Sequence, residues 1–401
     1  MNKTSLQKLP RNVWVVTITS FLTDISSEML VNLIPFFLAN VLGVRTAVIG
    51  LIDGIAETTA SLVKILSGAL SDKLGKRKWL TVAGYGLSTI AKPFLYFANA
   101  WGWVLGVRFV DRVGKGIRTA PRDALIADSI DKNQRGFAFG LHRAGDTAGA
   151  FLGLGIAAVI IWLTQSQTVE LARSTFQLIV LVSIVPAILA VIVLAVGTVD
   201  VPVAGKGVEK TRLTFRGLDA RFKSFLLVVV LFTLGNSSDA FILLRGQERG
   251  LSILQVMGMA LTFNLLYTIF AGPLGALSDK IGRHRLILGG WFTYGLIYLG
   301  LAFSRTGWQV WTMFGLYGLY YAATEGTAKA LVADLVPDNM RGTAYGLFNA
   351  AIGITALPAS LVAGLLWQGA GAWTGFGASA PFYFGSFMAL LAGLLFWRLV
   401  K

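Results

Sequence analysis

Long apolar runs separated by short polar connections extend along the whole chain. Several of these runs approach or exceed the roughly 20 residues that a helix needs to cross about 30 Å of hydrocarbon. They are rich in Leu, Gly, Ala and Phe, and they are too long for the strands of a membrane barrel, which have about 10 residues each. The runs with almost no charge are residues 80–91, 147–163, 175–199, 253–274, 286–304, 346–368 and 381–397.

The pattern predicts an all-α integral membrane protein with twelve transmembrane helices. One long polar stretch, residues 198–221, divides them six and six. We therefore expect an N-terminal six-helix bundle at 1–197, a cytoplasmic central loop at 198–221 and a C-terminal six-helix bundle at 222–401. The expected spans are 12–37, 47–70, 80–100, 102–126, 137–163, 175–197, 222–244, 253–277, 286–304, 308–333, 343–368 and 380–398.

Composition agrees with this assignment and gives it an orientation. Of 401 residues, 55% are hydrophobic and 14% are charged, against about 25% charged in soluble domains. The net charge of +15 lies in short loops, which argues against nucleic acid as a partner. Twenty-one Lys and Arg lie on one side and only five on the other. This bias predicts a bacterial-type inner (plasma) membrane protein with both termini in the cytoplasm.

Several kinds of chemistry are disfavoured by the sequence. There is no Cys, so disulfides, thiolate metal sites and Cys nucleophiles are excluded. No P-loop, zinc-hydrolase or serine-hydrolase signature is present. The apolar run after the basic N-terminus contains Asp24 and Glu28 and lacks a cleavage site, so we interpret it as the first span and not a signal peptide. We expect no enzyme activity, no cofactor and no metal.

The two halves of the chain repeat each other. GALSDKLGKRK at 68–78 returns as GALSDKIGRHR at 275–285, and LIADSIDKNQRGFAFGL at 125–141 returns as LVADLVPDNMRGTAYGL at 331–347. The offsets are 207 and 206 residues, which indicates duplication. Six spans in each half give parallel repeats, and in that arrangement solute sites lie between the halves near the middle of the bilayer.

Three motifs carry a family resemblance. The repeated loop is similar to G-x-L-[SA]-D-[RK]-x-G-[RK]-[RK], the fourth span to R-x-x-Q-G at Arg112 with Lys115 replacing Gln, and the fifth span to G-x-x-x-G-P-x-x-G with Ala150 replacing Pro. Over essentially its whole length the chain resembles the major facilitator superfamily, in its drug and metabolite efflux-like branch. The loop motif falls on Gly68, Asp72, Gly75, Arg77 and on Gly275, Asp279, Gly282, Arg283, and the fifth-span motif on Gly145, Gly149, Gly153.

The resemblance implies alternating access by rocking of two six-helix bundles. It also implies that the loop motif acts as a cytoplasmic latch and that the arginine of the fourth span takes part in coupling. We expect the cytoplasmic end of the fourth span, with Arg118, Arg122 and Asp123, to form a cytoplasmic gate together with this latch. The glycines of the fifth span are expected to allow close helix packing.

Ionisable residues inside the spans are the main functional candidates. A charge at the bilayer centre costs about 2.5–3.5 kcal/mol on insertion scales, so these residues must pair, line water or sit at span ends. Arg108, Arg112, Lys115 and Arg122 share one face of the fourth span. The residues are Lys64, Lys92, Arg108, Arg112, Lys115, Arg118, Arg122, Arg143 and Lys329, with Asp24, Glu28, Asp53, Glu57, Asp111, Asp123, Asp146, Asp239 and Glu325.

We expect a coupling and substrate cavity built from some of these groups. Glu28 ranks first as a proton carrier, because its repeat mate Asp239 keeps a carboxylate beside two serines. Asp53 and Glu57 are expected to be structural. Glu325 and Lys329 can pair within one helix. The cavity set is Asp24, Glu28, Arg108, Arg112, Lys115, Asp239, Glu325 and Lys329.

The function predicted from these features is secondary active transport of a small organic solute, as proton-coupled export. Two alternatives remain open: an organic-anion or phosphorylated-metabolite transporter that uses the basic stripe of the fourth span, and a lipid-moving protein. Paired basic residues would favour neutral or cationic solutes, and unpaired ones would favour anions. Sodium remains an alternative to the proton. The expected partners are the solute, protons and the lipid bilayer, and the expected state is a monomer.

Overall fold

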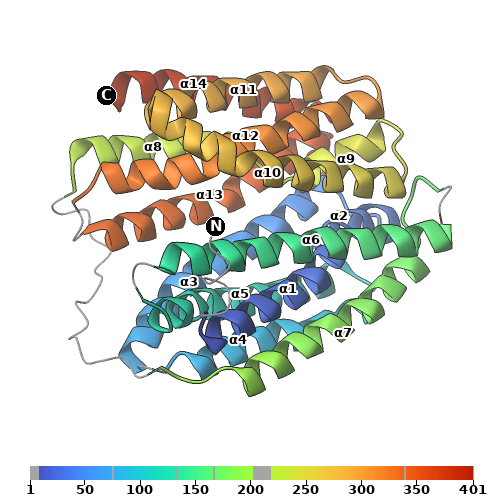
Figure 1. The fold of residues 1–401 in the computed structure, drawn as a ribbon. Helices are drawn as coiled ribbons and strands as arrows, with labels where there is room; N and C mark the ends of the chain where they lie inside the picture. Colours follow the sequence, from blue (N-terminus) through green and yellow to red (C-terminus); the bar gives the residue numbers. More distant parts are fainter. Residues whose placement is uncertain are drawn as a thin grey trace. The chain divides into compact units, whose positions relative to one another are not determined.

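The computed structural model describes residues 9–74, 76–131, 134–165, 168–201, 218–337 and 340–400. All regular secondary structure in these ranges is helical, and Figure 1 shows it. The first half contains α1 (Arg11–Val31), α2 (Ile34–Phe36), the π-helical η2 (Phe37–Val41), α3 (Thr46–Leu74), α4 (Lys78–Ala91), the 3₁₀ segment η3 (Lys92–Phe97), α5 (Trp101–Asp128), α6 (Arg135–Gln165) and α7 (Arg173–Gly197).

The helical segments of the second half also make up six of the predicted spans. It contains α8 (Ala220–Gly235), α9 (Ala240–Glu248), α10 (Ile253–Ile281), α11 (Arg283–Phe303), α12 (Gly307–Asp334), α13 (Arg341–Gln368) and α14 (Ala380–Leu399). Each of the twelve predicted spans coincides with one helix or with consecutive helical segments, which confirms the all-α membrane fold.

Nine helical segments among the described residues are long and apolar enough by themselves to cross a membrane. The predicted spans 80–100, 102–126 and 308–333 fall outside these nine. The reason is clearest for α5, whose sequence carries a dense series of charged residues between Arg108 and Asp123. Such a helix is stable in a bilayer only when its charges face other protein groups or water.

The chain forms two compact units that do not follow the sequence halves. The first unit comprises the described residues of Met1–Ile34, Thr59–Ile160 and Arg173–Lys210, and the second those of Pro35–Thr58, Ile161–Ala172 and Thr211–Lys401. Helix α3 is therefore shared between them. The division into domains at 198–221 stays a prediction, because residues 202–217 lie outside the described ranges.

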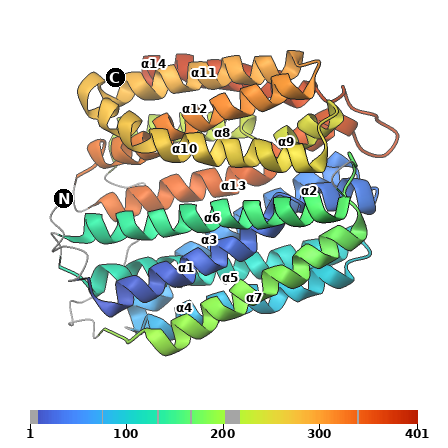
Figure 2. The same cartoon turned by 45° about the vertical axis from the view of Figure 1, so that its right-hand side comes forward.

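The same helix pairs recur in each unit, as the internal repeat predicts. In the first unit α4 packs on α5 and on α7, and α1 packs on α7 (Figures 1 and 2). In the second unit α11 packs on α12 and on α14, and α8 packs on α14. The partners correspond one to one when the second half is counted from α8. Parallel duplication therefore applies to the packing as well as to the sequence.

Glycines bring α6 into close contact with α1 in the first unit. A Cβ atom on Gly149 would lie 2.4 Å from the carbonyl oxygen of Phe21, and one on Gly153 would lie 2.4 Å from that of Ile25. A Cβ on Gly145 would likewise lie 2.7 Å from Thr17 Cγ2. Glycines four residues apart on α6 thus face α1 residues that are also four apart. Small residues permit such backbone contact between membrane helices.

We expect Gly149→Leu to destabilise the protein, because the new side chain would collide with the backbone of α1. Overpacking of this kind costs typically 1–3 kcal/mol, and here backbone is the obstacle. Thermal unfolding of the purified protein in detergent measures the loss. Gly155→Leu is the matched control, since nothing lies within 4 Å of a Cβ at Gly155 on the same helix. Equal unfolding temperatures for both variants would contradict the packing argument.

Candidate functional site

The first unit contains a cluster of opposite charges on α1, η3 and α5. Glu28 of α1 accepts a hydrogen bond from Asn32 Nδ2 at 3.1 Å. The cations whose charges interact electrostatically with its carboxylate are Lys115 and Arg112 of α5 and Lys92 of η3. Cations of two neighbouring elements thus offset the charge of this carboxylate in a membrane span, which is the condition under which such a group is tolerated.

Asp24 lies one helical turn from Glu28 on α1, and cations further along α5 act electrostatically on it. Arg118, Arg122 and Lys115 are the cations that act on it. Lys115 therefore serves both α1 carboxylates. The charges of Asp24 and Glu28 thus interact with those of the α5 cations, and the role of these residues in a solute cavity stays a prediction.

Lys92 belongs to this charged cluster, although its sequence context did not indicate a partner for it. Its Nζ donates to Ser26 Oγ at 2.7 Å and to Ser27 Oγ at 3.1 Å, and the residue is only 5% exposed. The carboxylates that act on it are Asp111 and Asp24. Lys92 begins the 3₁₀ segment just before Pro93. Its signal in the sequence was an intramembrane Lys, which spacing alone could not assign to a partner.

The two deeper arginines of α5 are buried in the first unit. Arg108 is 4% exposed and Arg112 is 5% exposed. Arg112 Nε lies 3.8 Å from Oδ2 of its neighbour Asp111, whose carboxylate is also acted on by Lys92 and Arg108. Asp111 is therefore part of the cluster, although we did not include it among the cavity residues.

Arg118 contacts α4. Its Nη1 donates to Ser88 Oγ at 3.1 Å, and its guanidinium lies 4.3 Å from the centre of the Tyr85 ring. Tyr85 Oη is in turn 2.9 Å from Ser20 Oγ of α1. Arg118 therefore ties α5 to α4 inside the first unit.

Arg122 likewise interacts within the first unit. It donates from Nε and Nη2 to Asp123 Oδ1, at 3.0 and 2.8 Å, and from Nη1 to Ser20 Oγ at 3.3 Å. The role of Arg118, Arg122 and Asp123 in a gate stays a prediction. Their observed partners lie on α1, α4 and α5.

The second unit holds the remaining candidates in two places. Asp239 Oδ1 and Asn236 Oδ1 both lie 3.1 Å from Tyr317 Oη. Lys329 Nζ is 2.9 Å from Glu325 Oε1, which confirms the predicted pairing within one helix. Tyr267 Oη also donates to Glu325, at 2.8 Å. Among the described residues no group of three or more Asp, Glu or His side chains could hold a metal ion.

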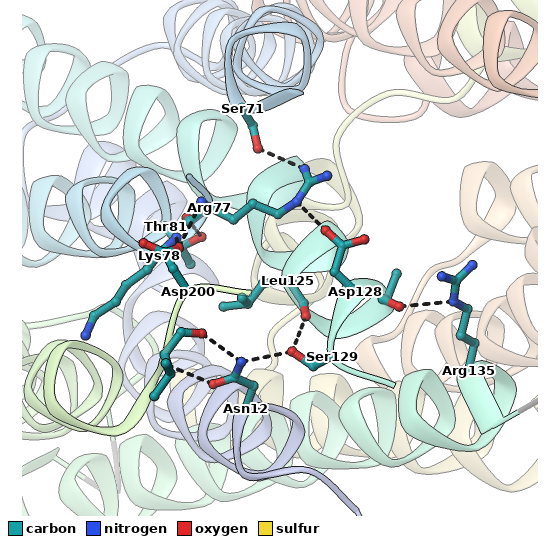
Figure 3. A network of polar contacts seen from close by, with 12 residues as sticks. Asn12, Ser71, Arg77, Lys78, Thr81, Leu125, Asp128, Ser129, Arg135 and Asp200 are labelled. Atoms are coloured by element: carbon teal, nitrogen blue, oxygen red, sulfur yellow. Dashed lines mark hydrogen bonds and ion pairs between the residues drawn. The ribbon is translucent and has the colours of Figure 1, made fainter. Parts of the chain in front are cut away.

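The loop motif after α3 forms a second polar cluster, shown in Figure 3. Arg77 Nε is 2.5 Å from Asp128 Oδ2 at the end of α5, and Arg77 Nη1 donates to Ser71 Oγ at 3.1 Å (Figure 3). The backbone N–H groups of Arg77 and Lys78 donate to Asp200 Oδ1 at 3.1 and 2.8 Å. This carboxylate satisfies donors that have no partner within a helix at the start of α4.

The same cluster connects α1 to α5 and to the chain after α7. Asn12 Nδ2 donates to Ser129 Oγ and to the Val199 carbonyl, both at 2.9 Å, and Asn12 Oδ1 accepts from Val199 N–H at 2.9 Å (Figure 3). Gly75 lies outside the described residues, as do the side chains of Asp72 and Asp279. The latch role of this loop stays a prediction, and Arg77 with its partners is the part of the loop motif that the structure describes.

The loop motif of the second half repeats this geometry. Arg283 Nη1 forms an ion pair with Asp334 and donates to the Ala330 carbonyl at 2.8 Å. Gly282, just before α11, has φ +92°, a conformation that side chains with a Cβ rarely adopt.

A further pair of contacts also repeats with the sequence offset. Arg135 Nε donates to the Ala127 carbonyl at 3.1 Å, and Arg341 Nε to the Ala333 carbonyl at 3.4 Å. Sequence reasoning missed Asp128 and Asp334, the acidic partners of the loop arginines. Their signal was present, since both fall at the same place in the repeated segments 125–141 and 331–347.

In the second unit, the start of α3 packs closely along α13. Thr46 Oγ1 donates to the Gly364 carbonyl at 3.1 Å, and Thr58 Oγ1 to the Gly353 carbonyl at 2.6 Å. Between them, a Cβ on Gly54 would lie 2.7 Å from the Cα of Leu357. We call this contact the α3–α13 seam. It joins a segment of the N-terminal half to a helix of the C-terminal half.

A pair of amides extends the seam at the same end. Asn40 Nδ2 donates to Gln247 Oε1 at 3.2 Å, and Gln247 Nε2 donates back to Asn40 Oδ1 at 2.9 Å. Backbone groups complete the set, because Leu171 N–H donates to Asn40 Oδ1 at 3.1 Å and Gln247 Nε2 to the Val169 carbonyl at 2.8 Å. Three segments distant in sequence therefore meet at this pair.

The family model of the Major Facilitator Superfamily matches residues 16–260 and 225–401. The chain belongs to the major facilitator superfamily. An uncharacterized MFS-type transporter of Methanocaldococcus jannaschii is 36% identical over 400 residues, covering 98% of this chain and 96% of that protein. The multi-drug resistance efflux pump PmrA of Streptococcus pneumoniae is 25% identical over 337 residues, covering 81% and 82%.

Solved structures of other family members have the same fold. The nucleoside transporter NupG matches with a TM-score of 0.78 and 14% identity, covering 97% of this chain and 99% of that one. A D-xylose-proton symporter matches with a TM-score of 0.77 and 15% identity, covering 98% of both chains. This major facilitator protein is a multi-pass membrane transporter and not an enzyme.

Proposed function

We propose that this transporter exports a small neutral or cationic organic solute in exchange for protons. The observation that carries the proposal is Glu28, an intramembrane carboxylate held by Asn32 and acted on by Lys115, Arg112 and Lys92. A buried carboxylate beside cations can take up a proton when those cations move away and release it when they return. Because such residues in spans are expensive, they are functional candidates by default.

The solute class is inferred from the charge balance in the first unit. The charges of Glu28 and Asp24 offset part of the positive charge on α5, which makes the basic stripe less attractive to an anion. This argues for neutral or cationic solutes over organic anions or phosphorylated metabolites. Similarity to PmrA, which is named a multi-drug resistance efflux pump, supports export as the direction.

Alternating access would use the loop clusters and the α3–α13 seam as opposite gates. The Arg77–Asp128 and Arg283–Asp334 pairs lie at the end that the charge bias predicts to be cytoplasmic. The seam and the Asn40–Gln247 pair belong to the other end of the same spans. In this proposal the protein is a monomer in the plasma membrane, with both termini in the cytoplasm.

Transport assays in proteoliposomes test the proposal. A panel of neutral, cationic and anionic organic compounds is offered with and without an imposed pH gradient. We expect at least one neutral or cationic compound to accumulate against its gradient only when the pH gradient is present. Empty vesicles and a protonophore are the controls. Gradient-driven movement confined to anions, or driven by sodium alone, would overturn the proposed solute class or coupling ion.

A further inference from the structure

An apolar groove opens on the first unit between the end of α4, η3 and α5. It encloses about 330 Å³, which is within the usual range for small-molecule sites. One wall comes from the end of α4 and the start of η3, including Ile90 and Phe94, and the other from α5, including Trp103 and Val110. Gly102 and Gly106 of α5 also line it.

The groove exists because two glycines leave space along α5. Nothing lies within 4 Å of a Cβ built on Gly102 or on Gly106. These glycines therefore do not serve close helix packing, unlike Gly114 of the same helix, where a Cβ would lie 2.6 Å from the Gly84 carbonyl oxygen. Trp103 Nε1 donates to the Phe94 carbonyl at 2.7 Å, which ties the two walls together.

The rims of the groove merge with the surface that the bilayer covers. Ile90 is 65% exposed and Phe94 is 47% exposed, and Phe97 and Phe109 beside them are 65% and 46% exposed. In a membrane-spanning unit such side chains meet lipid tails. Trp101 and Trp103 lie at the start of α5 and are also exposed, as is typical of residues at the membrane–water interface.

We propose that this groove holds one acyl chain of a bilayer lipid. The site goes beyond the proposed transport function and does not depend on it. The side chains that line the groove are apolar, so the groove recognises the acyl chain of the lipid and not its headgroup. The acyl chain would lie against the η3 segment, whose Lys92 side chain contacts Ser26 and Ser27 on α1. A lipid tail therefore packs behind the segment that carries a cation of the charged cluster.

Photochemical labelling tests the site. The full chain is reconstituted in phosphatidylethanolamine and phosphatidylglycerol vesicles that contain a trace of phosphatidylcholine with a diazirine on one acyl chain. After irradiation, labelled peptides are quantified by mass spectrometry. We expect labelling of residues 90–110 to exceed that of α7, which is also lipid-exposed at Leu181 and Ile192. The groove is expected to saturate as the labelled lipid is increased.

Filling the groove separates this site from ordinary lipid contact. In Gly106→Leu, and independently in Gly102→Leu, the new side chain occupies open space, so folding should be preserved. Each is expected to lower labelling of residues 90–110 about tenfold, the change that 1.4 kcal/mol of lost binding produces. Gly155→Leu, which adds the same side chain in open space on α6, should leave it unchanged.

Two results would overturn the proposal. One is labelling of the groove that is no greater than that of α7 or that both leucine variants leave intact. The other is loss of labelling when an organic compound that the protein transports is added, which would make the groove a solute site.

Discussion

Glu28→Gln is expected to reduce transport driven by a pH gradient to the level of empty vesicles. Glutamine keeps the shape and the contact with Asn32, but it cannot carry a proton. The cations Lys115, Arg112 and Lys92 would also lose the carboxylate that faces them. The measurement is solute accumulation in proteoliposomes with an imposed pH gradient, together with the unfolding temperature of the purified variant.

A second assay distinguishes lost coupling from lost binding. Exchange of labelled for unlabelled solute, without a pH gradient, should persist in Glu28→Gln because it needs no net proton movement. Glu170→Gln is the matched control, since Glu170 is an exposed carboxylate in the connection between α6 and α7. If Glu28→Gln still accumulates solute in response to the gradient, Glu28 is not the proton carrier.

Cross-linking of residues 40 and 247 should stop transport completely and reversibly. Asn40 and Gln247 donate hydrogen bonds to each other. Cysteines at both positions would therefore lie within reach of a short thiol-reactive cross-linker that a reductant can cleave. Alternating access requires segments of the two halves to separate at each end in turn. A covalent bridge at this pair would hold one end closed, and cleavage of the linker with a reductant should restore transport.

The absence of Cys from the chain makes this experiment specific. Asn40→Cys and Gln247→Cys alone, treated with the same linker, are the controls and should remain active. Transport by the cross-linked double variant at the rate of the reduced one would show that this contact persists through the cycle. In that case the seam would be a structural joint, and the proposed gate would have to lie elsewhere.

Helical spacing identified part of the charged cluster correctly because i and i+4 positions share a face in any helix. Asp24 and Glu28 lie opposite cations of α5, and Glu325 pairs with Lys329 on its own helix. The same reasoning could not place Arg118, which contacts Ser88 and Tyr85 on α4. That contact depends on how deeply α5 packs against α4, which the spacing within α5 does not contain.

By itself, the sequence determined the twelve spans, the duplication and the family, because each follows from local hydrophobicity or from repeated residues. Only the tertiary structure decided which charges meet across helices. It placed Lys92 on Ser26 and Ser27, joined Arg77 to Asp128, and assigned the two ends of α3 to different compact units. These contacts depend on crossing angles and on the register between helices, and membrane helices acquire both only when their side chains pack together.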